Sequence, residues 1–300
     1  MNSKEIYQLQ TTLLGWYEVH KREFPWRKET PVPFVTLISE VMLQQTQTSR
    51  VAEKLPEFLE KFPTIERLAA ATNAEIIRAW QGMGYNSRAI RLRDCARAVV
   101  EKHGGEIPST KAELLDLIGI GNYTASALMA FCFKKDVAVV DVNIRRVYSR
   151  IAKKMDTTAS LLPVKTVDVL AEKLYPRGQS SAWHQALMDI GAGYCTARKP
   201  NCKECPLKST CASAGTMTEQ SPVKRVEPSR YGVPRRIWRG KIVEQLRREH
   251  IGLSIDDIAA HLFGFAATNE DKVWLDELTK QLEKDGICMQ NNGLILLNEG

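Results

Sequence analysis

The sequence predicts a mainly α-helical fold that ends in a small winged-helix-like domain. Apolar residues recur at helical spacing through residues 1–212, and glycines and prolines divide this region into successive helices. Residues 237–300 carry three helical patterns followed by a β-hairpin pattern, which is the element order of a winged helix. Residues 213–236 are polar, with three prolines and two glycines, so we expect a linker there.

The composition is that of a globular protein. Hydrophobic residues make up 44% of the 300 residues and charged residues 26%, which excludes wholesale disorder, collagen and coiled coils. No apolar run is long enough to span a membrane, and the N-terminus lacks a signal-peptide core, so we expect a cytoplasmic protein without a membrane partner. The 42 Lys and Arg outnumber the 35 Asp and Glu; the net charge of +7 suits a polyanion partner without identifying one.

The segment SEVMLQQTQT at residues 39–48 has the periodicity of an amphipathic helix. Glu40, Gln44 and Gln47 fall on one stripe of this helix, by their spacing of four and three residues. Taken alone, such a stripe is most often a solvated polar face. The apolar residues on the opposite side are Leu37, Ile38, Val41 and Met42.

A second helix and a tight turn follow from local patterns. Thr110, followed by Glu113, forms a capping-box pattern that predicts a helix from Lys111. Gly119 and Gly121 then precede another helical run. This spacing can expose backbone N–H groups to a phosphate at a helix N-terminus, although a plain turn between helices is the commoner structure. The run VAVVDV at residues 137–142 is strand-like but too short to support a sheet by itself.

Four of the seven cysteines are crowded into one segment with the spacing C-x6-C-x2-C-x5-C: Cys195, Cys202, Cys205 and Cys211. An intracellular chain has little use for a disulfide framework, so this cluster predicts a metal site. Four thiolates can hold one tetrahedral ion or one cubane cluster, and the spacing alone leaves zinc and iron–sulfur open. The other three cysteines are expected to be small buried core residues: Cys95, Cys132 and Cys288.

The tail contains a basic segment from Lys224 to Arg248. The three helical stretches cover residues 237–250, 253–264 and 272–286, and Asn291, Asn292 and Gly293 between two apolar runs predict the turn of the final hairpin. The cations of the basic segment suit a solvated surface and a nucleic-acid backbone equally well. If the tail binds DNA, we expect a backbone anchor instead of a reader of the opposite strand, because the last helix is acidic and its insertion into a groove would be costly. The cations of the basic segment are Lys224, Arg225, Arg230, Arg235, Arg236, Arg239, Lys241, Arg247 and Arg248.

Several of these segments together resemble the MutY-type adenine DNA glycosylases of the helix-hairpin-helix, endonuclease III-like superfamily. The resemblance covers residues 5–212 and implies a two-lobed helix-hairpin-helix fold with a 4Fe–4S loop at the four cysteines. We expect the tail not to form the Nudix-like C-terminal domain that is usual in this family, because its pattern does not match one. The matching strings are FPWR (24–27), SEVMLQQTQT, GMGYNSRA (82–89), LLDLIGIGNYTASALMAF followed by VAVVDVNIRRVYSRI, and the cysteine segment.

The resemblance implies a monofunctional glycosylase of base excision repair that hydrolyses the N-glycosidic bond of adenine mispaired with 8-oxoguanine or guanine. Such bond cleavage passes through an oxocarbenium-like sugar and needs two carboxylates in different roles. Glu40 matches the acid that protonates the base, Asp141 the carboxylate that stabilises the sugar cation, and Asn143 an amide that orients Asp141. Tyr123 stands where bifunctional relatives carry a Schiff-base lysine. From the residues alone, Asp141 and Asn143 would be helix-capping residues.

The resemblance also implies contacts with double-stranded DNA that contains a mismatched or damaged base pair. Gln45 matches a residue that wedges into the space of the extruded base, while Met83 and Tyr85 match contacts to the opposite base. We expect a monomer associated with the nucleoid. Further predicted contacts to DNA or the target base are Arg22, Arg27, Gln44, Thr46, Gly119 and Gly121.

Two alternatives stay open. Val142 replaces the glycine that usually follows this aspartate in adenine glycosylases, and D-V-N is similar to thymine/uracil mismatch glycosylases, which act on T or U opposite G. Ile118 likewise stands where the family usually has proline. The other alternative is a non-catalytic iron–sulfur DNA-binding regulator, which the presence of Glu40 and Asp141 disfavours.

Overall fold

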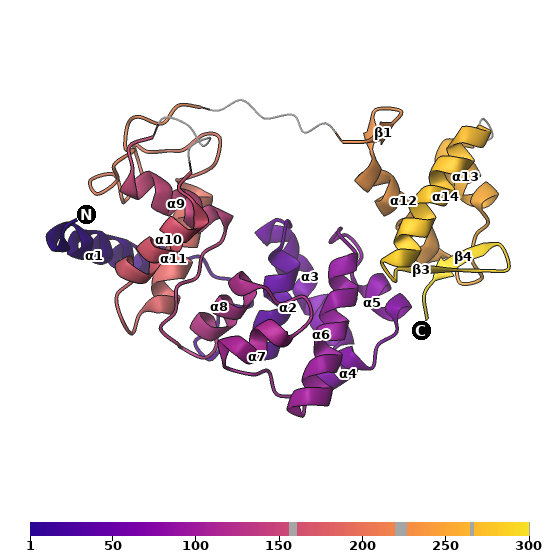
Figure 1. The fold of residues 1–300 in the computed structure, drawn as a ribbon, viewed down its shortest axis with the longest axis horizontal. Coiled ribbons are helices and arrows are strands. Elements are labelled where there is room, and N and C mark those ends of the chain that lie inside the picture. The colour runs from indigo at the N-terminus through magenta and orange to yellow at the C-terminus, as the bar shows by residue number, and fades with distance from the viewer. Residues whose placement is uncertain (156–160, 220–226, 265–266, 300) are drawn as a thin grey trace. The chain divides into compact units, whose positions relative to one another are not determined.

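The computed structural model describes residues 1–155, 161–219, 227–264 and 267–299, and these are mainly helical, as predicted (Figure 1). No described helix combines the length and apolar character that a membrane crossing requires. The helices are α1 (Ser3–His20), α2 (Pro33–Leu43), α3 (Thr48–Lys61), α4 (Ile65–Ala69), α5 (Asn73–Ala79), α6 (Ser87–His103), α7 (Lys111–Asp116), α8 (Asn122–Phe131), α9 (Val142–Ala152), α10 (Val164–Leu174), α11 (Ser180–Gly193), α12 (Arg235–Arg248), α13 (Ile255–Phe263) and α14 (Asn269–Lys284). The strands are β1 (Ser229–Arg230), β2 (Val233–Pro234), β3 (Cys288–Asn291) and β4 (Leu294–Leu297).

The chain forms two compact units, each made of segments that are distant in sequence. The first unit consists of Met1–Thr36, Ser109–Leu115 and Ile120–Lys224. The second unit consists of Leu37–Pro108, Asp116–Gly119 and Arg225–Gly300. The tail from residue 225 therefore belongs to the same unit as α3–α6 and the part of α2 from Leu37 onward.

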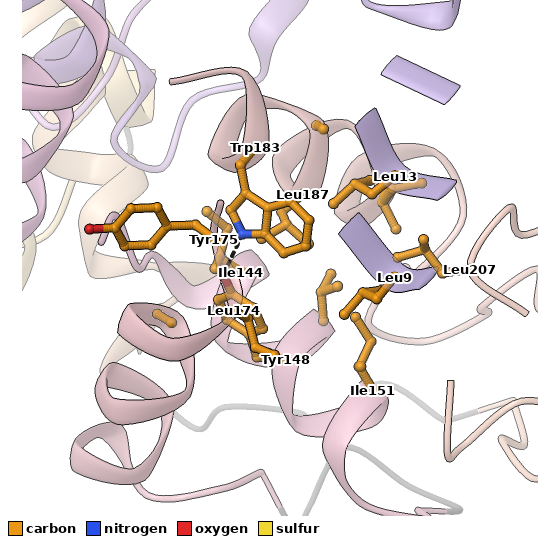
Figure 2. Close-up of a cluster of buried hydrophobic side chains, with 14 of the residues drawn as sticks. Leu9, Leu13, Ile144, Tyr148, Ile151, Leu174, Tyr175, Trp183, Leu187 and Leu207 are labelled. Atoms are coloured by element: carbon orange, nitrogen blue, oxygen red, sulfur yellow. Dashed lines mark hydrogen bonds between the residues drawn. The ribbon is translucent and has the colours of Figure 1, made fainter. Parts of the chain in front are cut away.

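The first unit is built on a core in which α11 packs against α1, α8 and α9. Leu9 and Leu13, four residues apart on α1, are fully buried in this core (Figure 2). The Trp183 indole N–H donates to the Tyr148 hydroxyl at 2.7 Å, so the core satisfies its largest polar groups internally. Burying each leucine contributes about 1.5–3 kcal/mol, and this cluster fixes α9 and α11 against each other.

The strand-like run at residues 137–142 is not a strand. Val137–Asp141 is irregular backbone, and Val142 begins α9. Side chains of α11 satisfy its backbone groups: the Val139 N–H donates to His184 Nε2 at 3.1 Å, and the Ser180 hydroxyl donates to the Val137 carbonyl at 2.6 Å. The prediction was wrong because Val137 and Val139 pack against apolar side chains of α8 and α11, and no strand in the described part of the chain pairs with this segment.

The helix predicted over residues 39–48 ends earlier than expected. α2 stops at Leu43, Gln47 is the N-cap residue of α3, and the backbone between them turns sharply through Gln45 with φ of 57°. The predicted stripe of Glu40, Gln44 and Gln47 on one helix is therefore wrong. The apolar side of α2 is buried as predicted.

Other local predictions are confirmed. α7 starts at Lys111, where the Glu113 N–H donates to Thr110 Oγ1 at 3.4 Å. Cys95 and Cys288 are buried. Cys132 is only half-buried, because it is the C-cap residue at which α8 ends.

The tail has the three helices and the β-hairpin that the sequence predicts. α12 and α13 pack against α14, and β3 pairs antiparallel with β4. Asn292 and Gly293 form the two-residue turn with φ of 48° and 77°, as a type I′ hairpin requires. A second small hairpin, β1–β2, lies inside the predicted linker at residues 213–236.

Candidate active site

Asp141 is held by its own helix at the start of α9. Its Oδ1 accepts from the Ile144 backbone N–H at 2.6 Å, and its Oδ2 accepts from the Asn143 amide at 2.7 Å. The first contact is an N-cap, which satisfies a helix N–H and places the carboxylate at the positive end of the helix dipole. The predicted pair Asp141 and Asn143 is thus brought together, with one fixed orientation of the carboxylate.

Two arginines connect α9 to the cysteine loop. Arg146 donates to the Asn143 side chain at 3.0 Å, to the Cys195 carbonyl at 2.7 Å and to the Gly191 carbonyl at 2.9 Å. A Cβ at Gly191 would lie 3.3 Å from Cβ of Asn143, so this glycine allows α11 to approach α9 closely. Arg150 donates to the Cys195 sulfur at 3.2 Å and to the Thr196 carbonyl at 2.8 Å.

The four cysteines line one small cavity of about 30 Å³. Burial raises the pKa of Cys205 and of Cys211 to about 11 in each case, so without a bound cation both are neutral thiols at pH 7. Among the described residues, no three His, Cys, Asp or Glu side chains are arranged to hold a single metal ion. The structure thus brings the predicted ligands together: Cys195, Cys202, Cys205 and Cys211 all line this cavity.

Arg22 and Arg27 enclose a buried carboxylate. Asp189 on α11 is 2% exposed and accepts from Arg22 Nε at 2.8 Å and from Arg27 Nη1 at 2.9 Å. Both guanidinium groups also lie about 5 Å from the centre of the Phe24 ring, which stacks on Trp26. All of these side chains except Asp189 line a cavity of about 640 Å³ in the first unit.

The predicted phosphate-binding turn connects α7 to α8. Gly119 has φ of 81°, and a Cβ there would lie 3.3 Å from Cβ of Arg91. Gly121 is the N-cap residue of α8 and offers no side chain to the first-turn N–H groups, which leaves them available to an anion. Tyr123 lies in the first turn of α8 and packs against a small apolar cluster of the first unit.

Glu40 lies within the buried part of α2 and is 4% exposed, in contrast to the solvated face that periodicity alone suggests. The next segment of the second unit, Gln44–Thr46, leaves the helix and exposes Gln45. A non-glycine residue at positive φ is strained by about 1–3 kcal/mol and persists only when its surroundings hold it.

Arg88 holds the strained backbone around Gln45 in place. Its guanidinium, 7% exposed, donates to the carbonyls of Val41 and Met42 at 2.9 Å each, to the Gln44 carbonyl, and to Thr46 Oγ1 at 3.0 Å. It also donates to the carbonyls of Met83 and Gly84, at 3.0 and 3.1 Å. Burial lowers the pKa of Arg88 to about 10, which keeps the side chain charged at pH 7.

One buried arginine therefore joins the predicted wedge segment to the predicted opposite-base turn. Within that turn the Met83 side chain is buried, whereas Tyr85 is 50% exposed and adopts φ of 46°. Tyr85 thus presents its ring to solvent, and Met83 supports the turn from inside.

Sequence reasoning missed the residues that hold the predicted ones in place: Asp189, Arg88, Arg146, Arg150 and His184. Arg146 and Arg150 are four residues apart and share one face of α9, so helical spacing could have paired them. Asp189 is a lone carboxylate in the apolar run ALMDIGAG, which is a signal of a buried ion pair. Arg88 bridges segments more than 40 residues apart, and no local pattern indicates this.

Comparison with known proteins gives a consistent result. Residues 38–162 match the HhH-GPD superfamily of base excision DNA repair proteins. The chain is 38% identical to an adenine DNA glycosylase of Mycobacterium tuberculosis, over 79% of this chain and 78% of that protein. It is 34% identical to a thymine/uracil-DNA glycosylase of Methanothermobacter thermautotrophicus, over 67% of this chain and 91% of that protein. The solved structure of a thermostable thymine-DNA glycosylase matches with a TM-score of 0.63 and 32% identity, covering 70% of this chain and 96% of that one.

Proposed function

The chain belongs to the HhH-GPD superfamily of base excision DNA repair proteins and is a DNA glycosylase, and we propose that it hydrolyses the N-glycosidic bond of adenine opposite 8-oxoguanine or guanine. The observation that carries the proposal is the constrained carboxylate of Asp141, in a chain similar to adenine glycosylases over most of its length. A fixed anion at a helix N-terminus can stabilise a sugar cation without reorganising during the reaction.

The two carboxylates have different tasks in this mechanism. Glu40 donates a proton to the leaving base, which makes the base a better leaving group. Asp141 faces the positive charge that develops on the sugar, and Asn143 keeps its Oδ2 in place. A water molecule completes the hydrolysis.

Tyr123 makes the enzyme monofunctional. A phenol cannot form an imine with the ring-opened sugar, whereas a lysine amine at this position could. The product is therefore an intact strand with an abasic site.

The cysteine loop holds a 4Fe–4S cluster in our proposal. Cys195, Cys202, Cys205 and Cys211 supply the soft thiolate donors that such a cluster requires, and all four line the same cavity. A bound cluster supplies a rigid cross-link between the four thiolates and one-electron redox chemistry. Arg150 donates to the Cys195 sulfur and so offsets part of the negative charge of the thiolates.

The contacts to DNA come from both units. Gln45 fills the space of the extruded base, and Tyr85 contacts the base left opposite. Gly119 and Gly121 present backbone N–H groups to a phosphate, and Gln44 and Thr46 hold the wedge segment. Arg22 and Arg27, bound to Asp189, stiffen the wall of the cavity near Trp26.

The domain plan is a further part of the proposal. Residues 1–212 form the glycosylase, residues 213–236 connect it to the tail, and residues 237–300 form a winged-helix-like domain. The enzyme acts as a monomer on double-stranded DNA, and we place its work at the nucleoid.

A second candidate is removal of thymine or uracil opposite guanine. The similarity to a thymine/uracil glycosylase and the exposed Val142 after Asp141 favour it. A single-turnover incubation with duplexes that hold A, T or U opposite G or 8-oxoguanine separates the two candidates, with alkali cleavage as the readout. The adenine proposal requires cleavage at A in the first minutes, and cleavage at T or U alone would replace it with the second candidate.

A further inference from the structure

We propose that His184 on α11 is a positioning residue for base release, because it holds the backbone segment Val137–Asp141 in the place from which the Asp141 carboxylate acts. The proposal rests on the proposed function, since it requires that Asp141 stabilises the sugar cation. The His184 side chain is fully buried, so it acts through the backbone that precedes Asp141 and not by touching the substrate.

Asp141 stands at a junction between two stretches of backbone. On its C-terminal side it caps α9, which fixes the carboxylate relative to that helix. On its N-terminal side, residues 137–140 belong to no helix or strand, so no regular ladder of backbone hydrogen bonds fixes them. The position of the carboxylate in the first unit therefore depends on the side chains that bind this segment.

Two side chains of α11, four residues apart and on one face of the helix, bind the segment. The Val139 N–H donates to His184 Nε2 at 3.1 Å, and the Ser180 hydroxyl donates to the Val137 carbonyl at 2.6 Å. Together the two contacts fix both the position and the direction of the chain just before it reaches Asp141.

The imidazole of His184 is an acceptor at Nε2 because its other nitrogen carries the proton. Nδ1 donates to the Ser180 carbonyl at 2.7 Å, which leaves the lone pair of the neutral ring on Nε2. Burial lowers the pKa of His184 to about 4, so the ring is neutral at pH 7. A leucine at this position would offer the Val139 N–H no acceptor.

Water cannot take the place of this acceptor. Val139 is fully buried and packs against apolar side chains of α8, so its N–H needs a partner inside the protein. The neighbouring contact differs in this respect, because the Ala138 N–H donates to Glu172 on α10 at 3.2 Å at an exposed site that water can reach. Loss of the His184 acceptor therefore forces the segment to move until its buried N–H finds another partner.

Such a movement displaces the Asp141 carboxylate from the sugar. We expect His184→Leu to slow base release about 10–100-fold, since a misplacement of about 1 Å in an active site can cost about 100-fold in rate. The affinity for a duplex with an abasic-site analogue should change by less than about 2-fold, because duplex binding rests mostly on phosphate contacts. His184→Gln supplies an amide oxygen as acceptor and should bring the rate back to within about 3-fold of the unchanged protein.

Tyr148→Phe is the matched control, because it also leaves a buried donor without its acceptor. The Trp183 indole N–H donates to the Tyr148 hydroxyl at 2.7 Å in the same unit, and this hydrogen bond does not involve Val137–Asp141 (Figure 2). Single-turnover rates are measured well below the melting temperature of each variant, so that a slower rate is not a smaller folded fraction. Tyr148→Phe should lower the melting temperature and change the rate by less than about 2-fold.

A double-mutant cycle distinguishes positioning of Asp141 from a general loss of stability. In the Asp141→Asn background the carboxylate is already gone, so His184→Leu should slow base release by less than about 2-fold further. Additive losses in the double variant would overturn the proposal. An unslowed His184→Leu, or no recovery of the rate by His184→Gln, would overturn it as well.

Two further measurements keep the outcome decisive. If His184→Leu does not fold, Ser180→Ala removes the other contact of α11 to the segment and should slow base release about 3–10-fold, again only while Asp141 is present. Asp141→Asn alone tests the proposed function: full retention of its rate would refute the role of Asp141 itself. A slow Asp141→Asn beside an unslowed His184→Leu would refute only the positioning role of His184.

Discussion

Asp141 makes two hydrogen bonds that serve different purposes. One caps α9 and the other orients the carboxylate through Asn143. Asparagine is as good an N-cap residue as aspartate but carries no charge. The substitution Asp141→Asn therefore separates the structural contribution of this residue from its chemistry.

We predict that Asp141→Asn folds normally, binds duplex DNA and releases base at least about 100-fold more slowly, because removal of a group that stabilises the transition state costs about 2.7–4 kcal/mol. Single-turnover rates and a thermal melt measure the two properties. Retention of the rate would remove Asp141 from the mechanism.

A substitution at Arg88 tests whether this residue holds the predicted wedge segment and the predicted opposite-base turn in place. Arg88→Met leaves the carbonyls of Val41, Met42 and Met83 without their shared donor, and we predict a loss of about 2–4 kcal/mol in unfolding free energy. Arg91→Met, at an exposed position on the same helix, should change it by less than about 0.5 kcal/mol. Equal losses in the two variants would show that Arg88 is an ordinary helix residue.

At the scale of elements, the segment Val137–Asp141 depends on a neutral histidine. Burial lowers the pKa of His184 to about 4, and its Nε2 accepts from the Val139 N–H while Nδ1 donates to the Ser180 carbonyl at 2.7 Å. The unfolded chain takes up a proton near pH 6.5 and the folded protein does not. This contribution to stability is therefore complete above pH 6.5 and is lost as the pH falls toward 4.

We predict that the unfolding free energy falls by as much as about 3 kcal/mol between pH 7 and pH 4 through this one group. His184→Gln removes the titration and should flatten that part of the profile. Urea unfolding at several pH values measures it, and an unchanged profile in the variant would contradict the assignment to His184.

The structural features that could be predicted from the sequence are those determined by residues close together in the chain. The capping box at Thr110, the turn at Asn292 and the proximity of Asp141 to Asn143 all involve residues within four positions of each other. The end of α2 at Leu43 was missed because Arg88, far along the chain, captures the carbonyls that would have continued the helix. The strand-like run was mistaken for the same reason, since residues of α11 satisfy its backbone.

At the scale of the whole molecule, the cysteine loop predicts a coloured protein. Purified without oxygen, it should be yellow-brown and contain about four irons per chain, and Cys202→Ser should lower the iron content. Metal analysis with a visible spectrum measures this. Stoichiometric zinc without visible absorbance would instead assign the loop to a single ion.

We propose that the whole molecule releases adenine from DNA and leaves the strand intact. The most direct measurement is chromatographic identification of the free base after single-turnover incubation with an A:8-oxoguanine duplex, beside denaturing electrophoresis of the strand before alkali. We predict free adenine in proportion to enzyme, an uncut strand that alkali then cleaves, and no free base with Glu40→Gln. Release of thymine or uracil but not adenine from parallel duplexes would contradict the adenine specificity, and undiminished release by Glu40→Gln would contradict the role of Glu40 as the acid.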